Sequence, residues 1–316
     1  MAGLLLLVIA YNHNSNTIYN FSGQAYGTTW SISSSEYIAD NHKDEIKNII
    51  NKIDLIASNY KPESEISQIN INYSEYQFIS DDLFKILEIA KVVELSTDGY
   101  YNIMLGKISS TLGFAPDFGQ NTFQNKASTF DIDETNKSLK RYSKNWFDLS
   151  SIAKGYAVQE IHNYLISNNL MNHVIDIGGE IIINGNKDGI PWNIGIQNPL
   201  SSVDNAATTI SNKNNNFLAI ATSGEYRNFK LDEYGNKVTH TINPKTLSSI
   251  KNKILSVTVV NEYSATYADS YATAFNAMGL NRAIEMANNK NIAIMVIYQN
   301  DEAVDIIYSD KWYDLF

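Results

Sequence analysis

The feature that most limits the fold is a series of short apolar runs, several of them separated only by tight polar breaks. Runs 292–298 and 303–308 flank a polar stretch that begins at Gln299, and this pattern predicts a closing hairpin. Further strands are expected at 21–33, at 173–184 with an interruption at Gly178-Gly179, at 192–197, 217–222 and 254–260, with a hairpin around 133–136. Strands joined in this way favour an α+β fold of antiparallel or mixed sheets with packed helices over a doubly wound parallel sheet.

Other segments have the apolar spacing of amphipathic helices. They are 44–57, 81–97, about 152–168, 265–278 and 282–288. Ser80 or Asp81 is expected to cap the second of these helices, which ends at Asp98-Gly99. Residues 198–216 are polar and are predicted to form an irregular excursion.

Composition limits the function as well as the fold. The chain has 316 residues, of which 44% are hydrophobic, so it can bury a large core. Its net charge of −10 argues against nucleic acid as the main partner. Anionic small molecules are not excluded, because local potential outweighs net charge at short range. The chain contains no cysteine, which excludes disulfides, thiolate nucleophiles and cysteine-based zinc sites.

The N-terminal residues 1–20 are interpreted as separate from a single domain over 21–316. Residues 4–10 are apolar but too few to span a bilayer, which needs about 20 residues. They are typical of the end of an export signal followed by a polar, disordered segment, with a local helix as the alternative. A lipoprotein signal would end in cysteine, and Tyr11 stands near that position, so these residues do not support a lipid anchor.

The stretch 147–155, FDLSSIAKG, is predicted to run from a strand end into a helix. Ser150 or Ser151 is expected to cap the helix. Lys154 beside a helix N-terminus would favour a phosphate, because the unpaired N–H groups and the dipole both attract negative charge. The alternative is an ordinary capped helix with an extended lysine.

Asp269 and Thr273 lie four residues apart in a predicted helix, which places their oxygens on one side. A carboxylate and a hydroxyl suit Mg²⁺, which binds few protein ligands and leaves room for a substrate phosphate. The alternative is that Asp269 only interacts with the dipole of the first helical turn.

Further polar groups follow other predicted strands. Gly178-Gly179-Glu180 would allow close approach of a ligand to the backbone, although a glycine bulge explains it equally well. Ser223 and Arg227 offer a hydroxyl and a cation in a turn, or simply a surface loop. His240 precedes a proline-closed turn and is, as a single histidine, more often structural than catalytic. No serine-hydrolase, zinc-protease or nucleotide-loop motif is present.

The order of these segments resembles that of the ApbE family of FAD:protein FMN transferases over about residues 21–310. The segments are AYGTTW, SNYKPESEISQIN, TDGYYN, FDLSSIAKGYAVQ, VIDIGGEI, ATSGEYRNF, HTINPKT, SVTVV and ADSYATAFNAMG. The resemblance implies an α+β enzyme that uses Mg²⁺ and FAD. Such an enzyme transfers FMN to a threonine (or serine) hydroxyl of a target protein and releases AMP.

The resemblance also implies roles for residues. The backbone carbonyl of Ser151 and the side chains of Asp269 and Thr273 would hold Mg²⁺. Lys154 would contact FAD near its diphosphate, and Asp269 or His240 would be the catalytic base. The other expected FAD-binding positions are Tyr26, Ser58, Asn59, Tyr60, Asn102, Gly178, Gly179, Glu180, Ser223, Arg227, His240 and Ile242.

Some positions depart from the family pattern. Tyr26 stands where the family often has methionine, and Asn102, Glu180 and Asn243 each replace an aspartate. Two other functions therefore stay open: a Mg²⁺-dependent FAD pyrophosphatase that uses water as acceptor, and a protein that binds FAD without turnover. The family habit further implies export to the periplasm, membrane association through the N-terminus, and acceptors among membrane redox subunits.

Overall fold

The computed structural model describes residues 17–119, 129–199, 206–214, 217–224, 229–231, 233–251, 253–300 and 303–316. Within these ranges the main sheet has eight strands in the order β1-β2-β6-β7-β10-β15-β16-β17, and every neighbouring pair is antiparallel. The strands are β1 (Tyr19–Ala25), β2 (Thr28–Ser34), β6 (His173–Ile177), β7 (Glu180–Asn184), β10 (Leu218–Gly224), β15 (Ile254–Asn261), β16 (Ala293–Gln299) and β17 (Val304–Tyr308).

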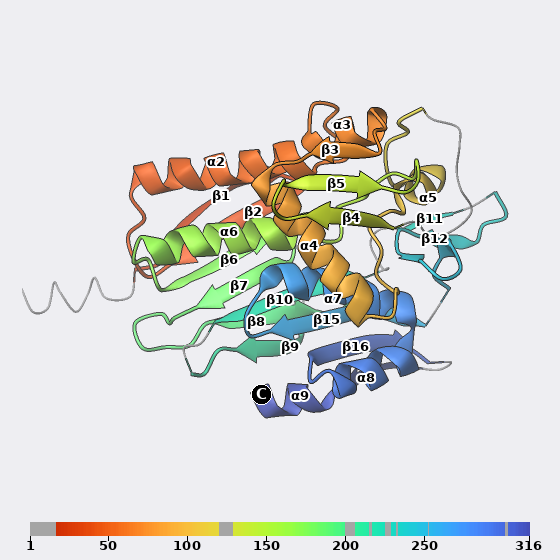
Figure 1. Ribbon diagram of the computed structural model, residues 1–316. Coiled ribbons are helices and arrows are strands. Elements are labelled where there is room, and N and C mark those ends of the chain that lie inside the picture. The colour runs from red at the N-terminus through yellow and green to blue at the C-terminus, as the bar shows by residue number, and fades with distance from the viewer. Residues whose placement is uncertain are drawn as a thin grey trace, which may run out of the picture.

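Helices cover one face of this sheet (Figure 1). They include α2 (Asp40–Ala57), α4 (Asp81–Ser96), α6 (Ala153–Ser167), α7 (Ala265–Met278) and α8 (Leu280–Asn289). α2 turns its isoleucines inward because apolar residues recur at helical spacing. Ser80 caps α4 by accepting the N–H of Leu83, as the sequence predicts. α6 and α7 pack side by side in the middle of this layer.

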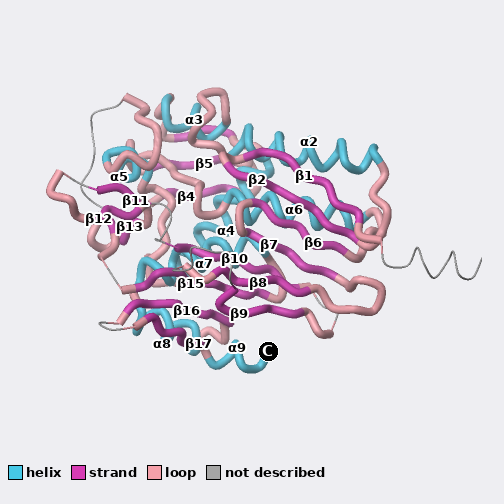
Figure 2. Tube along the Cα trace, turned by 180° about the vertical axis from the view of Figure 1, so that it is seen from behind, coloured by secondary structure: helices cyan, strands magenta, loops and turns pink. Residues whose placement is uncertain are grey.

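The opposite face carries a smaller core. Figure 2 shows the hairpin of β8 (Asn193–Gln197) and β9 (Ala206–Ser211) lying across it, with α9 (Asp310–Leu315) at the edge. Strand β10 contributes side chains to both cores, because successive side chains of a strand point to opposite faces of the sheet. Ala219 and Ala221 pack under the helices, whereas Leu218 and Ile220 pack against the β8–β9 side.

Smaller elements surround one end of the main sheet. β3 (Tyr76–Phe78), β5 (Ser138–Arg141) and β4 (Phe130–Asp133) form one sheet, whereas β11 (Phe229–Leu231) pairs with β12 (Lys237–Thr239), and β13 (Ile242–Asn243) with β14 (Ser248–Ser249). Two short helices, α3 (Glu65–Ile71) and α5 (Gly106–Thr111), complete this end. None of the helices in the described ranges is both long and apolar enough to cross a bilayer.

The α+β prediction is confirmed, and so are the main helices and the closing hairpin. The predicted single strand 21–33 is wrong, because the chain turns back at Tyr26-Gly27. Both residues have positive φ, 54° and 72°, as a two-residue hairpin turn requires. The interruption at Gly178-Gly179, with φ of 64° and 103°, is likewise a hairpin turn.

Other local predictions also need correction. The excursion 198–216 contains β9, and neither α5 nor α9 was expected. The predicted strand end before Ser150 has no regular structure. Of the proposed N-terminal segment, residues 1–16 lie outside the described ranges, and β1 already begins at Tyr19.

Candidate active site

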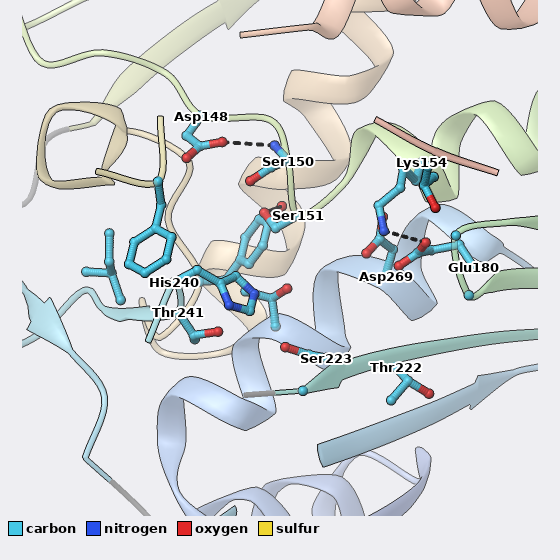
Figure 3. Close-up of a pocket in the computed structure, with 18 of the residues that line it drawn as sticks. Asp148, Ser150, Ser151, Lys154, Glu180, Thr222, Ser223, His240, Thr241 and Asp269 are labelled. Carbon is cyan, nitrogen blue, oxygen red and sulfur yellow. Dashed lines mark hydrogen bonds and ion pairs between the residues drawn. The ribbon is translucent and has the colours of Figure 1, made fainter. Parts of the chain in front are cut away.

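A cavity of about 710 Å³ opens at the end of the main sheet where β7 and β10 meet the N-terminus of α6 and the middle of α7. Figure 3 shows side chains from these elements pointing toward one another across it. A volume of this size lies within the range of pockets that hold cofactors. Its lining includes Tyr60, Asn102, Ser151, Lys154, Gly178, Gly179, Glu180, Ser223, His240, Ile242, Asp269 and Thr273, all predicted from the sequence.

Buried charges lie at the inner wall of the cavity. The Lys154 Nζ donates to Glu180 Oε2 at 2.5 Å, and Asp269 is 5% exposed beside them. Burial raises the pKa values of Glu180 and Asp269, because the charged forms lose water, and Lys154 only partly opposes this. Burial alone would lower the pKa of Lys154, but the charges of Glu180 and Asp269 outweigh it and raise that pKa. Two buried carboxyl groups therefore share one lysine, and burial favours their protonated forms until further positive charge is supplied.

Asp269 caps the start of α6 from the neighbouring helix. The Gly155 N–H is one of the first N–H groups of α6, which have no partner within the helix, and it donates to Asp269 Oδ2 at 2.9 Å. The Ala153 N–H donates to the Leu149 carbonyl at 2.9 Å and the Tyr156 N–H to the Ile152 carbonyl at 3.0 Å. The helical ladder thus does not take up the Ser151 carbonyl oxygen, and Ser151 lines the cavity.

Gly155 makes this arrangement sterically feasible. A Cβ at this position would lie 2.5 Å from the Ala265 backbone oxygen and 2.7 Å from the Asp269 Cβ. Because such approaches do not occur in real structures, only glycine lets α6 come this close to α7. The close packing brings Lys154 and Asp269 into one cluster.

The segment before Ser150 is held by side chains from elsewhere in the chain. The Asn59 and Asn70 amides donate to the Phe147 carbonyl at 2.7 and 2.9 Å. Their amide oxygens accept the N–H groups of Leu149 and Phe147. These bonds satisfy the backbone as a strand partner would. The segment is thereby fixed without being a strand.

The predicted serine cap is also wrong. Ile152 occupies the N-cap position of α6 and its own side chain makes no capping hydrogen bond, whereas Asp269 accepts an N–H of the first turn. Ser150 instead uses its N–H to reach Asp148 Oδ1 at 3.0 Å. Ser151 is bonded through its hydroxyl to the Tyr101 hydroxyl at 3.1 Å. Both serines line the cavity, so their place beside the helix start was right although their role was not.

The opposite wall comes from β10 and the turn after β12. Ser223 Oγ accepts from the Asn276 amide of α7 at 3.1 Å. The Thr222 hydroxyl is hydrogen-bonded to the Thr258 hydroxyl of the neighbouring strand β15 at 2.9 Å. The His240 ring lies edge-on to Phe114, with 6.2 Å between ring centroids. At the same mouth, the Tyr60 hydroxyl donates to the Phe114 carbonyl at 2.6 Å, although Tyr60 is 69% exposed.

Some predicted site residues do not line the cavity. The Tyr26 hydroxyl donates to the Ile50 carbonyl, and its hairpin turn holds it away from the cavity. The Ser58 hydroxyl accepts the Tyr60 N–H. The Asn59 amide donates to the Phe147 carbonyl and accepts the Leu149 N–H. It therefore holds the backbone of the site without lining the cavity. Arg227 lies outside the described residues.

Sequence reasoning missed several residues that shape the site. Tyr101 and Asp148 line the cavity beside predicted positions, and Asn70 holds the same segment as Asn59. Tyr101 and Asp148 belong to the conspicuous TDGYYN and FDLSS segments, which is a usable signal. Asn70 gives no local signal, because its partner Phe147 lies 77 residues further along the chain.

The donor set of the cavity fits Mg²⁺. The described lining contains four carboxylates, those of Asp148, Asp176, Glu180 and Asp269, and a single lysine. A phosphate-bearing ligand would be repelled here unless a cation offset the carboxylates. No three His, Asp or Glu side chains in the described ranges cluster as a metal site. A cation would therefore be held by Asp269 with hydroxyl and carbonyl oxygens, a hard-oxygen set that Mg²⁺ accepts.

Fold and cavity together define a site of cofactor size with charged groups at its inner wall. The model of the ApbE family matches residues 26–296, most of the chain. The chain therefore belongs to the ApbE family.

Curated relatives cover nearly the same length. The FAD:protein FMN transferase of Haemophilus influenzae is 30% identical over 323 residues, covering 95% of this chain and 92% of the relative. That of Vibrio cholerae is 30% identical over 313 residues, covering 94% and 92%.

Solved structures agree with the fold. The flavin transferase ApbE from Vibrio cholerae has a TM-score of 0.81 at 26% identity and covers 95% of this chain and 99% of that one. The flavinyl transferase ApbE from Pseudomonas stutzeri, at 22% identity, has a TM-score of 0.82 with coverage of 95% and 97%, and so supports the fold alone. The predicted family and fold class are confirmed.

Proposed function

We propose that this protein is an FAD:protein FMN transferase that uses Mg²⁺ to move FMN onto a threonine (or serine) hydroxyl of an acceptor protein. The observation that carries the proposal is the cavity wall on which Lys154, Asp269, Thr273 and Ser151 meet. The named relatives support the enzyme class and FAD as its substrate. The acid-rich lining supports the need for a divalent cation.

The chain's residues divide the work of binding. The Ser151 carbonyl, the Asp269 carboxylate and the Thr273 hydroxyl would hold Mg²⁺, which when bound supplies positive charge to the diphosphate. Lys154 places a second positive charge beside the same phosphates, and Glu180 keeps its ammonium group in position. Positive charge at a phosphoryl group stabilises the transition state of its transfer.

The reaction forms one bond and breaks one. The acceptor hydroxyl oxygen bonds to the phosphorus on the riboflavin side of FAD, and the bond from that phosphorus to the bridging oxygen breaks. AMP leaves with the bridging oxygen. The hydroxyl proton must pass to a base. We assign this role to His240 rather than Asp269, because one Asp269 oxygen already accepts the Gly155 N–H and the carboxylate is needed for the cation.

The test is to mix the protein with FAD, Mg²⁺ and an acceptor domain that contains the target threonine. We expect AMP by chromatography together with flavin fluorescence on the acceptor band of a denaturing gel. AMP without a labelled acceptor would identify a pyrophosphatase instead. Neither product, with FAD still bound, would identify a binding protein.

We also propose that the protein is exported to the periplasm and acts there on membrane redox subunits, associating with the membrane through its N-terminus. The apolar residues 4–10 and the polar stretch after them support export. A fusion of residues 1–20 to a reporter that is active only after export tests this proposal, and a reporter that stays inactive would contradict it.

A further inference from the structure

The hydroxyl of Tyr101 ties Ser151, which carries one proposed cation ligand, to the main core. Tyr101 is 2% exposed, and its ring belongs to that core together with Ala268 and Ala272 of α7. Its hydroxyl lies 3.1 Å from Ser151 Oγ, just before α6. Ala268 and Ala272 directly precede Asp269 and Thr273 in the sequence. One buried tyrosine thus connects the Ser151 side chain with the core to which the ligand-bearing helix α7 belongs.

Ser151 needs such a restraint more than its neighbours do. Phe147 and Leu149 are fixed by the amides of Asn59 and Asn70, but these bonds stop at Leu149. The Gly155 N–H donates to Asp269, so it does not fix the Ser151 carbonyl either. The Tyr101 hydroxyl is the contact that links the Ser151 side chain to the buried core.

We propose that Tyr101 is a positioning residue for the cation site, which acts by fixing Ser151 to the core that α7 shares, so that the Ser151 carbonyl converges with Asp269 and Thr273. The proposal rests on the proposed function, because it assumes that a divalent cation binds there. Tyr101 does not itself contact the cation. Residues that orient metal ligands commonly change metal affinity by about 10- to 100-fold when altered.

The test is Tyr101→Phe, which removes only the hydroxyl, with Tyr156→Phe as the matched control. The Tyr156 hydroxyl is also buried and donates to Asp82 at 2.7 Å, but it does not line the cavity. The readout is the Mg²⁺ concentration that gives half-maximal FAD binding, followed by flavin fluorescence without any acceptor. We expect Tyr101→Phe to raise this concentration about tenfold. FAD affinity without Mg²⁺ should stay at the wild-type value, and Tyr156→Phe should leave both quantities unchanged.

A second variant checks the route of the effect. Ser151→Ala keeps the carbonyl but removes the side chain that Tyr101 holds, so it should raise the Mg²⁺ requirement as much as Tyr101→Phe. The double variant should be no worse than either single one. Additive effects, or a Tyr101→Phe protein with a lower melting temperature but the wild-type Mg²⁺ requirement, would overturn the inference alone. A wild-type protein whose FAD binding ignores Mg²⁺ would overturn it together with the proposed cation site.

Discussion

The two ends of α6 bury polar groups in different ways. At its N-terminus, Lys154 lies with Glu180 and Asp269 at the cavity wall, and these groups are charged partners. Toward its C-terminus, His162 Nδ1 lies 3.0 Å from His173 Nε2, and the His162 ring packs against Phe217. Burial lowers the pKa of His162 to about 4 and that of His173 to about 3, so this end is uncharged near neutral pH.

The difference separates a binding site from a structural cluster. The histidine pair satisfies itself, because one ring donates to the other and His173 also bonds the Leu170 carbonyl. The N-terminal cluster has two buried carboxylates for one lysine and faces open volume. Burying more charged groups of one sign than the other costs free energy unless a ligand of opposite charge binds beside them. Buried charge beside a cavity is therefore the stronger sign of function.

Asp269→Asn should have the largest effect. Asparagine still offers an oxygen to the Gly155 N–H, so the start of α6 should survive, but the negative charge for the cation is lost. We expect FMN transfer to fall about a thousandfold, in line with the loss of a main electrostatic group. The rate of AMP release measures this, with circular dichroism as the control for folding. A rate within threefold of wild type would mean that the charged end of α6 is no cation site.

Lys154→Met should weaken FAD binding. The loss of a charge-assisted contact to phosphate is worth about 1.5–3 kcal/mol, or roughly 10- to 100-fold in affinity. Because this variant also leaves Glu180 buried without its partner, Lys154→Met combined with Glu180→Gln separates the two effects. Fluorescence titration with FAD is the measurement. Wild-type affinity in both proteins would remove Lys154 from the site.

Gly155→Ala tests the close approach of α6 and α7. The new methyl group would meet the Ala265 backbone oxygen at 2.5 Å, and backbone cannot move aside cheaply. We expect a loss of about 1–3 kcal/mol in the free energy of unfolding, as in other overpacked cores. Urea denaturation measures it, with Gly195→Ala as the control, since a Cβ there meets only the Ala206 Cβ at 3.3 Å. Equal stabilities would show that α6 and α7 can separate freely.

The histidine end predicts a dependence of stability on pH. Below the ordinary histidine pKa of about 6.5, these histidines are protonated in the unfolded chain but stay neutral in the folded protein. The free energy of unfolding therefore falls as the pH falls. Between pH 6.5 and 5.5 we expect each histidine to contribute a loss of about 1 kcal/mol. Urea denaturation of wild type and His162→Phe at both pH values measures the difference. If the variant loses as much stability as the wild type over this interval, His162 is not buried in its neutral form.

Local pattern predicted a large part of the molecule. The apolar spacing of α4 and α7, with the predicted cap of α4, gave both helices nearly to the residue, and the four-residue interval placed Asp269 and Thr273 on one side of α7. The turn at Tyr26-Gly27 was missed because the strands on both sides read as one continuous apolar alternation. The turn between the two strands depends on positive φ angles at Tyr26 and Gly27. Tyrosine rarely adopts a positive φ, so Tyr26 does not indicate a turn.

The sequence by itself determined the helices, most strands and the side-chain chemistry available to the site, because these follow from periods of two to four residues. Only the tertiary structure decided how Ser151 and Asp269 meet. The bonds that arrange them join Asn70 to Phe147, Asn59 to Leu149 and Gly155 to Asp269, over 77, 90 and 114 residues of chain. Contacts at such separations depend on how whole elements pack, and no short stretch of sequence encodes them.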